Sequence, residues 1–140
     1  MEGRGVYKFS SPSTVGFYLG EFKENAFHGL GRMVFRDGTQ YFGSFTNNSM
    51  NSARAILKYG NGDTYKGGIS QNMKSDEKGE GIYTYSNGDL YQGQFRADKK
   101  EGEGKLQIAA QHISYIGEFK DDRKTGKCKL YDFGPAFGRY

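Results

Sequence analysis

Five stretches of the chain share the pattern Tyr-x-Gly-x-Phe or a close variant, and this repetition constrains the fold more than any other feature. They read YLGEF, YFGSF, YKGGI, YQGQF and YIGEF, and they begin at Tyr18, Tyr41, Tyr65, Tyr91 and Tyr115. The intervals between these tyrosines are 23, 24, 26 and 24 residues. A nearly constant period of this length is typical of repeat architectures, in which each unit packs mainly on its neighbours. We therefore expect a single domain built from five similar units.

Each unit has a second half, in which Gly-x-Gly precedes alternating large and polar residues. In the first unit it reads GLGRMVF at 29–35, followed by Asp37-Gly38; in the third it reads GEGIYTY at 79–85, followed by Asn87-Gly88. A period of two predicts β-strands, and Asp-Gly or Asn-Gly between strands predicts a tight turn. Each unit is therefore predicted to be a β-hairpin, and consecutive hairpins should pair into an antiparallel meander of about eleven strands.

The predicted domain spans 1–140, and its units are placed by their tyrosines. A half repeat at 3–17 comes first, because GRGVYKF has the second-half pattern without a preceding Tyr-x-Gly-x-Phe. Whole units follow at 18–40, 41–64, 65–90, 91–114 and 115–132. The remaining residues, 133–140, are expected to act as a cap or a docking segment.

The recurring glycines are explained by the room that aromatic rings need. Alternate residues of a strand share a face, so Tyr18 and Phe22 are predicted to lie beside Gly20, Gly29 and Gly31. A glycine leaves empty the volume in which a neighbouring ring can lie flat, which offsets its entropic cost in a strand. The repeat glycines are Gly20, Gly29, Gly31, Gly43, Gly67, Gly79, Gly81, Gly93, Gly102, Gly104, Gly117 and Gly126.

This array of units resembles the MORN repeat (membrane occupation and recognition nexus) from about Gly3 to about Leu130. The resemblance implies an all-β fold, an elongated single-layer curved antiparallel β-meander built of stacked hairpins. It also implies a non-enzymatic structural scaffold or adaptor that mediates protein–protein interactions at cytoskeletal or membrane-adjacent sites, cilia and axonemes among them. Some members of the family bind a partner segment along the grooved face. Departures from the pattern include Ala53-Arg54-Ala55 in place of Gly-x-Gly and Ile69 in place of phenylalanine.

A single-layer sheet leaves much of its aromatic face uncovered, and a large exposed apolar patch usually marks an interface. We therefore expect a groove for a helix or tail segment of another protein, with the tyrosine ring faces packed and their hydroxyls and rims available. The open edges of the sheet should contact further proteins, so a subunit of a large complex is expected. The predicted groove residues are Tyr18, Phe22, Phe35, Tyr41, Phe45, Tyr59, Tyr65, Tyr85, Tyr91, Phe95, Tyr115 and Phe119.

The net charge of +4 mildly favours an anionic partner. Basic residues are densest around the last hairpin, at Lys120, Arg123, Lys124, Lys127 and Lys129. A solvated hairpin explains this run, and the alternative is contact with an anionic membrane surface. The second hypothesis is accordingly a peripheral phospholipid-binding module at a membrane–cytoskeleton junction. A third is the regulatory region of a lipid kinase or methyltransferase complex, against which the start at Met1 and the decaying last repeat argue.

No pattern in the sequence points to catalysis, a cofactor or a metal. His28 and His112 are predicted in or near loops of distant units, and Cys128 replaces a repeat glycine as a small packed side chain. Nucleic acid is not expected as a partner, because the basic residues mostly avoid the predicted aromatic face. No segment resembles a signal peptide or a membrane span. We expect a cytoplasmic, cytoskeleton-associated protein, with the cilium or flagellum as the best single location.

Overall fold

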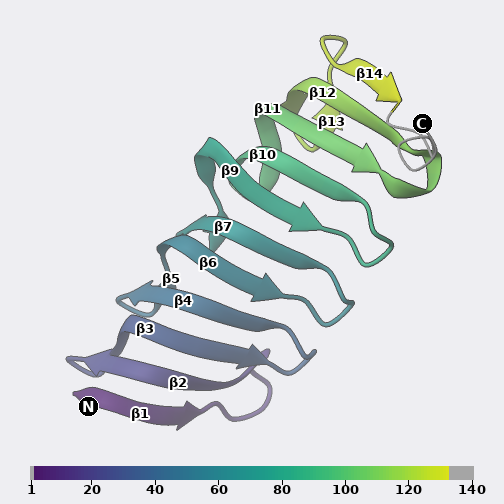
Figure 1. Cartoon of the computed structure of the whole chain (residues 1–140). Helices are drawn as coiled ribbons and strands as arrows, with labels where there is room; N and C mark the ends of the chain where they lie inside the picture. Colours follow the sequence, from purple (N-terminus) through teal and green to yellow (C-terminus); the bar gives the residue numbers. More distant parts are fainter. Residues whose placement is uncertain (1, 133–140) are drawn as a thin grey trace.

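The computed structural model describes residues 2–132, and all of their strands belong to one open antiparallel sheet (Figure 1). The sheet has fourteen strands and does not close into a barrel, which confirms the predicted all-β meander. Its main strands, in spatial order, are β1 (Gly3–Lys8), β2 (Val15–Lys23), β3 (Ala26–Phe35), β4 (Gln40–Thr46), β6 (Ser52–Lys58), β7 (Thr64–Ser70), β9 (Asp76–Thr84), β10 (Leu90–Arg96), β11 (Lys99–Ile108), β12 (Ile113–Lys120) and β13 (Arg123–Lys124). Three short strands complete it: β5 (Ser49–Met50) pairs with β4, β8 (Met73–Lys74) with β7, and β14 (Lys129–Asp132) with β12.

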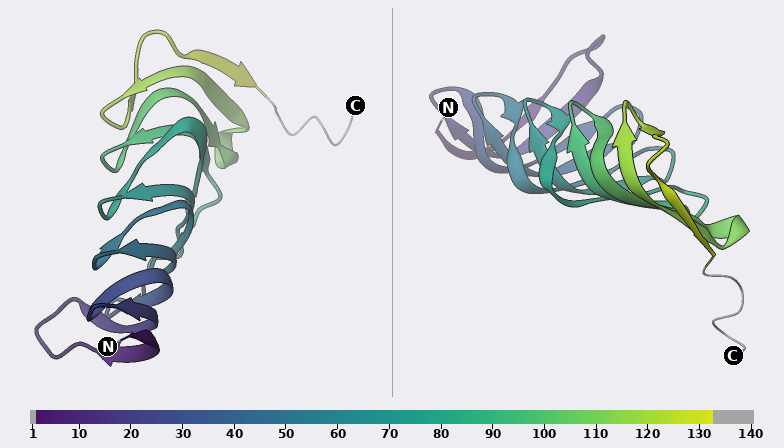
Figure 2. Two further views of the ribbon diagram at one scale, coloured as in Figure 1. Left: turned by 90° about the vertical axis from the view of Figure 1, so that its left-hand side faces the viewer. Right: turned by 90° about the horizontal axis from the view of Figure 1, so that it is seen from above.

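The spatial order of the main strands follows their order in the sequence, so the two ends of the described chain lie at opposite ends of the strip (Figure 1). Turned views show a narrow strip that twists along its length (Figure 2). The described residues include no α-helix, and hence no helix long and apolar enough to cross a membrane. A short 3-10 turn, η1 (Ala109–Gln111), lies where the fourth unit lacks its turn glycine. The predicted role of residues 133–140 falls outside the described part of the chain.

The strands turn along two long sides of the strip, which we call its long edges. One of them is formed by two-residue hairpin loops that the sequence reasoning overlooked. Both residues of each loop have positive φ, which is the geometry of a type I′ turn and suits the right-handed twist of paired strands. The loops are Glu24-Asn25, Asn47-Asn48, Gln71-Asn72, Ala97-Asp98 and Asp121-Asp122. A signal for them was present, because an asparagine or aspartate stands seven residues after each repeat tyrosine.

These loops also join neighbouring hairpins. The Oδ1 of Asn48 accepts a hydrogen bond from the N–H of Phe27 at 2.8 Å, and the N–H of Asn48 donates to the carbonyl of Phe27 at 3.0 Å. Asn72 makes the same pair of bonds with Met50, at 2.7 and 3.0 Å. Each repeat is thereby fixed to the one before it through backbone groups, which sets their relative position.

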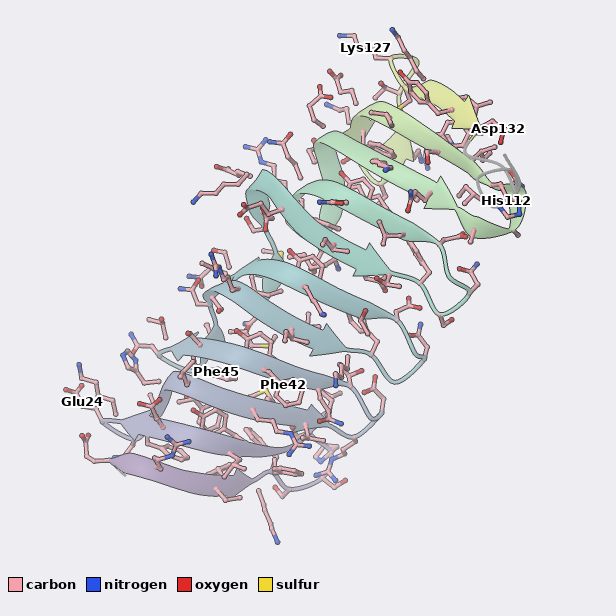
Figure 3. The ribbon with its side chains drawn as sticks, in the orientation of Figure 1. Glu24, Phe42, Phe45, His112, Lys127 and Asp132 are labelled. Carbon is pink, nitrogen blue, oxygen red and sulfur yellow. The ribbon has the colours of Figure 1, made fainter. Side chains whose placement is uncertain are left out.

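The opposite edge contains the predicted Asp-Gly and Asn-Gly turns. Figure 3 labels Glu24 on the first edge and His112 on the second. Here the residue two positions before a repeat tyrosine connects adjacent units: Thr39 accepts a hydrogen bond from the N–H of Gly60 at 3.1 Å, and Asp63 from the N–H of Ser86 at 2.8 Å. Side chains at both edges therefore satisfy backbone donors and hold the hairpins in register.

Candidate functional site

The aromatic side chains of the repeats lie on one face of the sheet, which we call the ring face and define by Tyr18, Tyr41, Tyr65 and Tyr91. Each of these four side chains is 0% exposed. Edge-to-face contacts connect them to the phenylalanines: Tyr41 to Phe45 with centroids 5.1 Å apart, and Tyr91 to Phe95 and Phe119, also at 5.1 Å. Aromatic rings therefore make up most of the core along the ring face, and Met33, Ala55, Leu57 and Ile69 complete it.

Glycine makes this packing of rings possible. A methyl carbon at Gly31 would lie 2.5 Å from Cε1 of Tyr18, and one at Gly43 would lie 2.6 Å from the hydroxyl oxygen of Tyr41. The positions at which an added carbon would meet a repeat tyrosine are Gly20, Gly31, Gly43, Gly67, Gly81, Gly93 and Gly104. At these glycines the ring occupies the space that a side chain would need.

The first glycine of each Gly-x-Gly has a different role from the one that alternation predicts. Gly29, Gly79 and Gly102 have φ between 74° and 85°, a left-handed conformation that glycine adopts without strain. A carbon added at Gly29 would meet the carboxylate of Glu21, on the opposite face from the rings. A β-bulge lies here, because the register shifts between Gly20 and Phe22, and a bulge breaks the period of two on which the prediction relied.

The hydroxyls of the four ring-face tyrosines are bonded to the backbone, contrary to the expectation that they are available to a partner. Each donates to the backbone carbonyl three residues later: Tyr18 to Glu21 at 2.7 Å, Tyr41 to Ser44 at 2.8 Å, Tyr65 to Gly68 at 2.8 Å and Tyr91 to Gln94 at 2.9 Å. These bonds close the bend of the strand around the bulge. The repeat tyrosine therefore fixes the backbone as well as filling the core.

Burial disfavours ionisation of tyrosine hydroxyls in this fold, which predicts that the free energy of unfolding falls at high pH. Burial raises the pKa of Tyr41 to about 12 and, with help from Asp98 and Asp63, that of Tyr59 to about 12. Tyrosines of the unfolded chain ionise near their ordinary value of 10.0, so unfolding releases protons above that pH. The stabilisation is complete below pH 10 and is lost as the pH rises towards 12.

We expect the free energy of unfolding to fall by roughly 1 kcal/mol for each such tyrosine between about pH 8 and about pH 11. Urea titrations at the two pH values measure this change. In Tyr41→Phe, which has one ionisable phenol fewer, the fall should be smaller. An unfolding free energy that does not change over this range would contradict the burial of these phenols.

The predicted groove residues divide into two groups by exposure. Phe22, Phe45, Phe95 and Phe119 are buried together with the four repeat tyrosines of the ring face, so these eight form the core. Those that remain half-buried, and can contact a partner, are Phe35, Tyr59, Tyr85 and Tyr115. Phe42 and Phe45 both come from β4 and are labelled in Figure 3. Phe42 lies on the face opposite the ring face, and the guanidinium carbon of Arg32 is 5.4 Å from its ring centroid.

An open pocket of about 650 Å³ lies on the ring face near β1, β2 and β3. It is lined by Tyr7, Phe9, Val15, Phe22, Asn25, Phe27, Met33, Phe35, Asn48, Met50 and Asn72. None of these residues is charged. Of them, only Phe22 and Phe35 were predicted as groove residues, so the pocket is mainly a product of tertiary structure.

Phe27 is the most important residue that the sequence reasoning missed. It stacks on Tyr18 with ring centroids 4.1 Å apart and planes 20° apart, on the side of the ring away from Gly31. Tyr18 is thus enclosed between a glycine and a phenylalanine. In the first unit, the residue nine positions after the repeat tyrosine therefore covers that tyrosine.

The basic run of the last hairpin is divided between faces. Arg123 pairs with Lys120 and Lys129 with Ile116 on the face opposite the rings, whereas Lys124 pairs with Phe119 on the ring face. The Nζ of Lys124 lies 4.0 Å from the ring centroid of Tyr115, and that of Lys127 lies 3.9 Å from the carboxylate of Glu118. The five cations therefore do not form one continuous patch.

Two polar side chains near the rings form hydrogen bonds that stabilise the fold. The hydroxyl of Tyr83 donates to Asp63 at 2.6 Å, which lowers the pKa of that carboxyl. The Sγ of Cys128 donates to the carbonyl of Glu118 at 3.0 Å and packs against the core.

His28 lies within β3, not in a loop, and His112 follows the η1 turn. Residues 2–132 contain no group of three or more His, Cys, Asp or Glu arranged to hold a metal ion.

Comparison with protein families gives a match to the family model described as the MORN repeat. The matched residues are 1–11, 18–40, 76–90, 91–110 and 115–132, which together make up more than half of the chain. Residues 41–75, outside these matches, include the departures at Ala53-Arg54-Ala55 and Ile69, yet they form hairpins of the same kind. Comparison with curated proteins gives no match.

Proposed function

Because this chain belongs to the MORN-repeat family, we propose that it is a non-enzymatic scaffold that binds a segment of another protein on its ring face. The observation that supports this most directly is the uncharged pocket of about 650 Å³, formed by side chains of the half repeat and the first units. Its volume lies within the ~300–1,000 Å³ of typical binding pockets. Large apolar side chains of a partner could enter it and cover Phe9, Phe35 and Met50.

We further propose that the protein works inside a larger cytoskeletal assembly, and we favour a ciliary or axonemal one because scaffolds of this family occur there. The first strand, β1, supports contact with a neighbour, because it pairs only with β2 among the described strands. Val6 and Tyr7 of β1 are also half exposed. An uncovered edge strand offers backbone donors and acceptors to another chain.

The test compares two substitutions on opposite faces of the same region. Met50→Glu places a carboxylate in the pocket, whereas Leu30→Glu places one on the opposite face, at a side chain that is 62% exposed. The tagged full chain and both variants are expressed in the native cells, and the captured proteins are quantified by mass spectrometry. Thermal melts check that both variants are folded.

We expect Met50→Glu to reduce capture of a protein that binds the ring face by roughly tenfold or more, since a charge in an apolar anchor pocket is poorly tolerated. Leu30→Glu should leave capture close to that of the unmodified chain. Equal losses in the two variants, or no loss in either, would show that the ring-face pocket is not the binding site.

A further inference from the structure

One repeating position of the ring face changes from apolar to cationic along the sheet. Nine residues after each repeat tyrosine stand, in order, Phe27, Met50, Lys74, Lys100 and Lys124. Each pairs across the hairpin with the last residue of a Tyr-x-Gly-x-Phe stretch, so all five lie on the ring face. The residue at this position is therefore apolar in the first two units and cationic in the last three.

The three lysines lie directly over aromatic rings. Lys74 and Lys100 are each shared between two rings. The Nζ of Lys74 is 5.6 Å from the ring centroid of Tyr83 and 6.0 Å from that of Tyr65. The Nζ of Lys100 is 5.4 Å from the ring centroid of Tyr85 and 5.6 Å from that of Tyr91. Lys124 lies closest to its ring, 4.0 Å from the centroid of Tyr115. Cation–π attraction helps to hold the ammonium groups over these rings.

Nearby carboxylates leave these ammonium groups with capacity for a further partner. Asp98 and Asp122 accept the backbone N–H of Lys74 and Lys100 at 2.7 and 2.8 Å, which fixes both aspartates at the edge loops. Their carboxylates lie 3.5 and 3.9 Å from the corresponding Nζ atoms. Each ammonium has three N–H donors, so one distant carboxylate does not saturate it. Within residues 2–132, Lys124 has no ion pair.

We propose that the ring face is a two-part site for one amphipathic acidic helix, a deduction that rests on the proposed binding of a protein segment. The apolar end of the helix occupies the pocket lined by Phe9, Phe27 and Met50, and its carboxylates face the three lysines. Charge complementarity favours a helix that is apolar at one end and acidic along the rest. The pocket has no charged residue, and the same repeating position is lysine in each of the last three units.

The spacing of the lysines gives the spacing of the acids. One repeat contributes two principal strands, which is a step of about 9.6 Å across the sheet. Residues i and i+7 of an α-helix are about 10.5 Å apart along its axis and share a face. A helix that crosses the strands can therefore present one glutamate or aspartate to each of Lys74, Lys100 and Lys124 at heptad intervals. About 28 helical residues span the distance from the pocket to Lys124.

The experiment selects binders from a displayed library of helical peptides of about 28 residues with randomised surface positions. Selection is carried out on the unmodified full chain and on the double variant Lys100→Gln/Lys124→Gln, whose melting behaviour is first compared with that of the unmodified chain. A third selection uses Phe35→Ser, which changes a residue of the pocket and leaves the three lysines in place. Sequencing of the enriched peptides reports acidic residues at each helical position.

On the unmodified chain we expect roughly tenfold enrichment of Glu and Asp at heptad intervals beyond an apolar end, equivalent to about 1.4 kcal/mol. The double variant should lose the acidic preference and keep the apolar one, and Phe35→Ser should do the reverse. Enriched peptides without an acidic bias, or with the same bias on the double variant, would overturn the two-part site while leaving ring-face binding intact. Failure to enrich any peptide whose binding depends on Phe35 would contradict the proposed function as well.

Discussion

Gly31→Ala is expected to lower the free energy of unfolding by about 3 kcal/mol, because the core has no room for one methyl group there. That methyl carbon would lie 2.5 Å from Cε1 and 2.6 Å from the hydroxyl oxygen of Tyr18. The ring has no free direction in which to move. Phe27 stacks on its other side at 4.1 Å, and its hydroxyl is bonded to the carbonyl of Glu21 at 2.7 Å.

Urea denaturation followed by circular dichroism measures this loss, and Gly126→Ala provides the matched control. A carbon added at Gly126 would meet no atom within 4 Å, so the expected change is within about 0.5 kcal/mol. If Gly31→Ala and Gly126→Ala changed stability equally, close packing of rings on glycines would not be what holds the sheet together.

Tyr65→Ala is expected to cost about 4 kcal/mol, as large aromatic-to-alanine changes do in a core. Tyr65 is 0% exposed, contacts Phe95 edge to face with centroids 5.1 Å apart, and donates to the carbonyl of Gly68 at 2.8 Å. It lies in the central unit, so its loss should weaken contacts with the units on both sides. In repeat proteins such neighbour contacts supply much of the stability.

Two further variants separate the contributions of the ring and the hydroxyl. Tyr65→Phe keeps the ring and should cost only about 1 kcal/mol, from one lost hydrogen bond. Tyr7→Ala removes an aromatic ring that is 50% exposed on the terminal strand, and its cost should be below about 1.5 kcal/mol. A loss for Tyr7→Ala as great as that for Tyr65→Ala would mean that central and terminal rings contribute alike.

The buried tyrosines also explain why a ring-face binding test cannot use them. Tyr65→Ala or Tyr91→Ala would remove core side chains that are 0% exposed, so lost binding would report lost folding. Half-buried residues at the rim, such as Phe35 and Met50, can be changed with less effect on the core. The binding experiments above therefore rely on these positions.

Several features of the fold were predictable because they depend on local pattern. The five tyrosines predicted the number and length of the units, and the alternation of large and polar residues predicted strands with one aromatic face. The turns at Asp37-Gly38 and Asn87-Gly88 followed from the conformational freedom of glycine. These inferences need only neighbouring residues, which is why they agree with the structure.

The candidate site was less predictable, because it depends on which side chain lies above each ring. Phe27 and Lys100 follow their tyrosines by the same nine residues, yet they reach the ring face only after a type I′ turn and a pairing with Phe22 or Phe95. The bulge at Gly29 also interrupts alternation, so a face assigned from period two is unreliable beyond it. The division of the basic run between faces has the same cause, since Lys120 and Lys124 come from opposite sides of one hairpin loop.

The sequence by itself determined the repeat period, the strands, the antiparallel meander and the MORN-repeat family, because hydrophobic alternation and glycine placement are read along the chain. Tertiary structure alone decided that the four ring-face tyrosines are buried in the core and that their hydroxyls are bonded to the backbone. It also decided that the surface above them runs from apolar to cationic. The physical reason is that burial and face depend on the bend, the bulge and the neighbouring strand, none of which is specified within a single Tyr-x-Gly-x-Phe stretch.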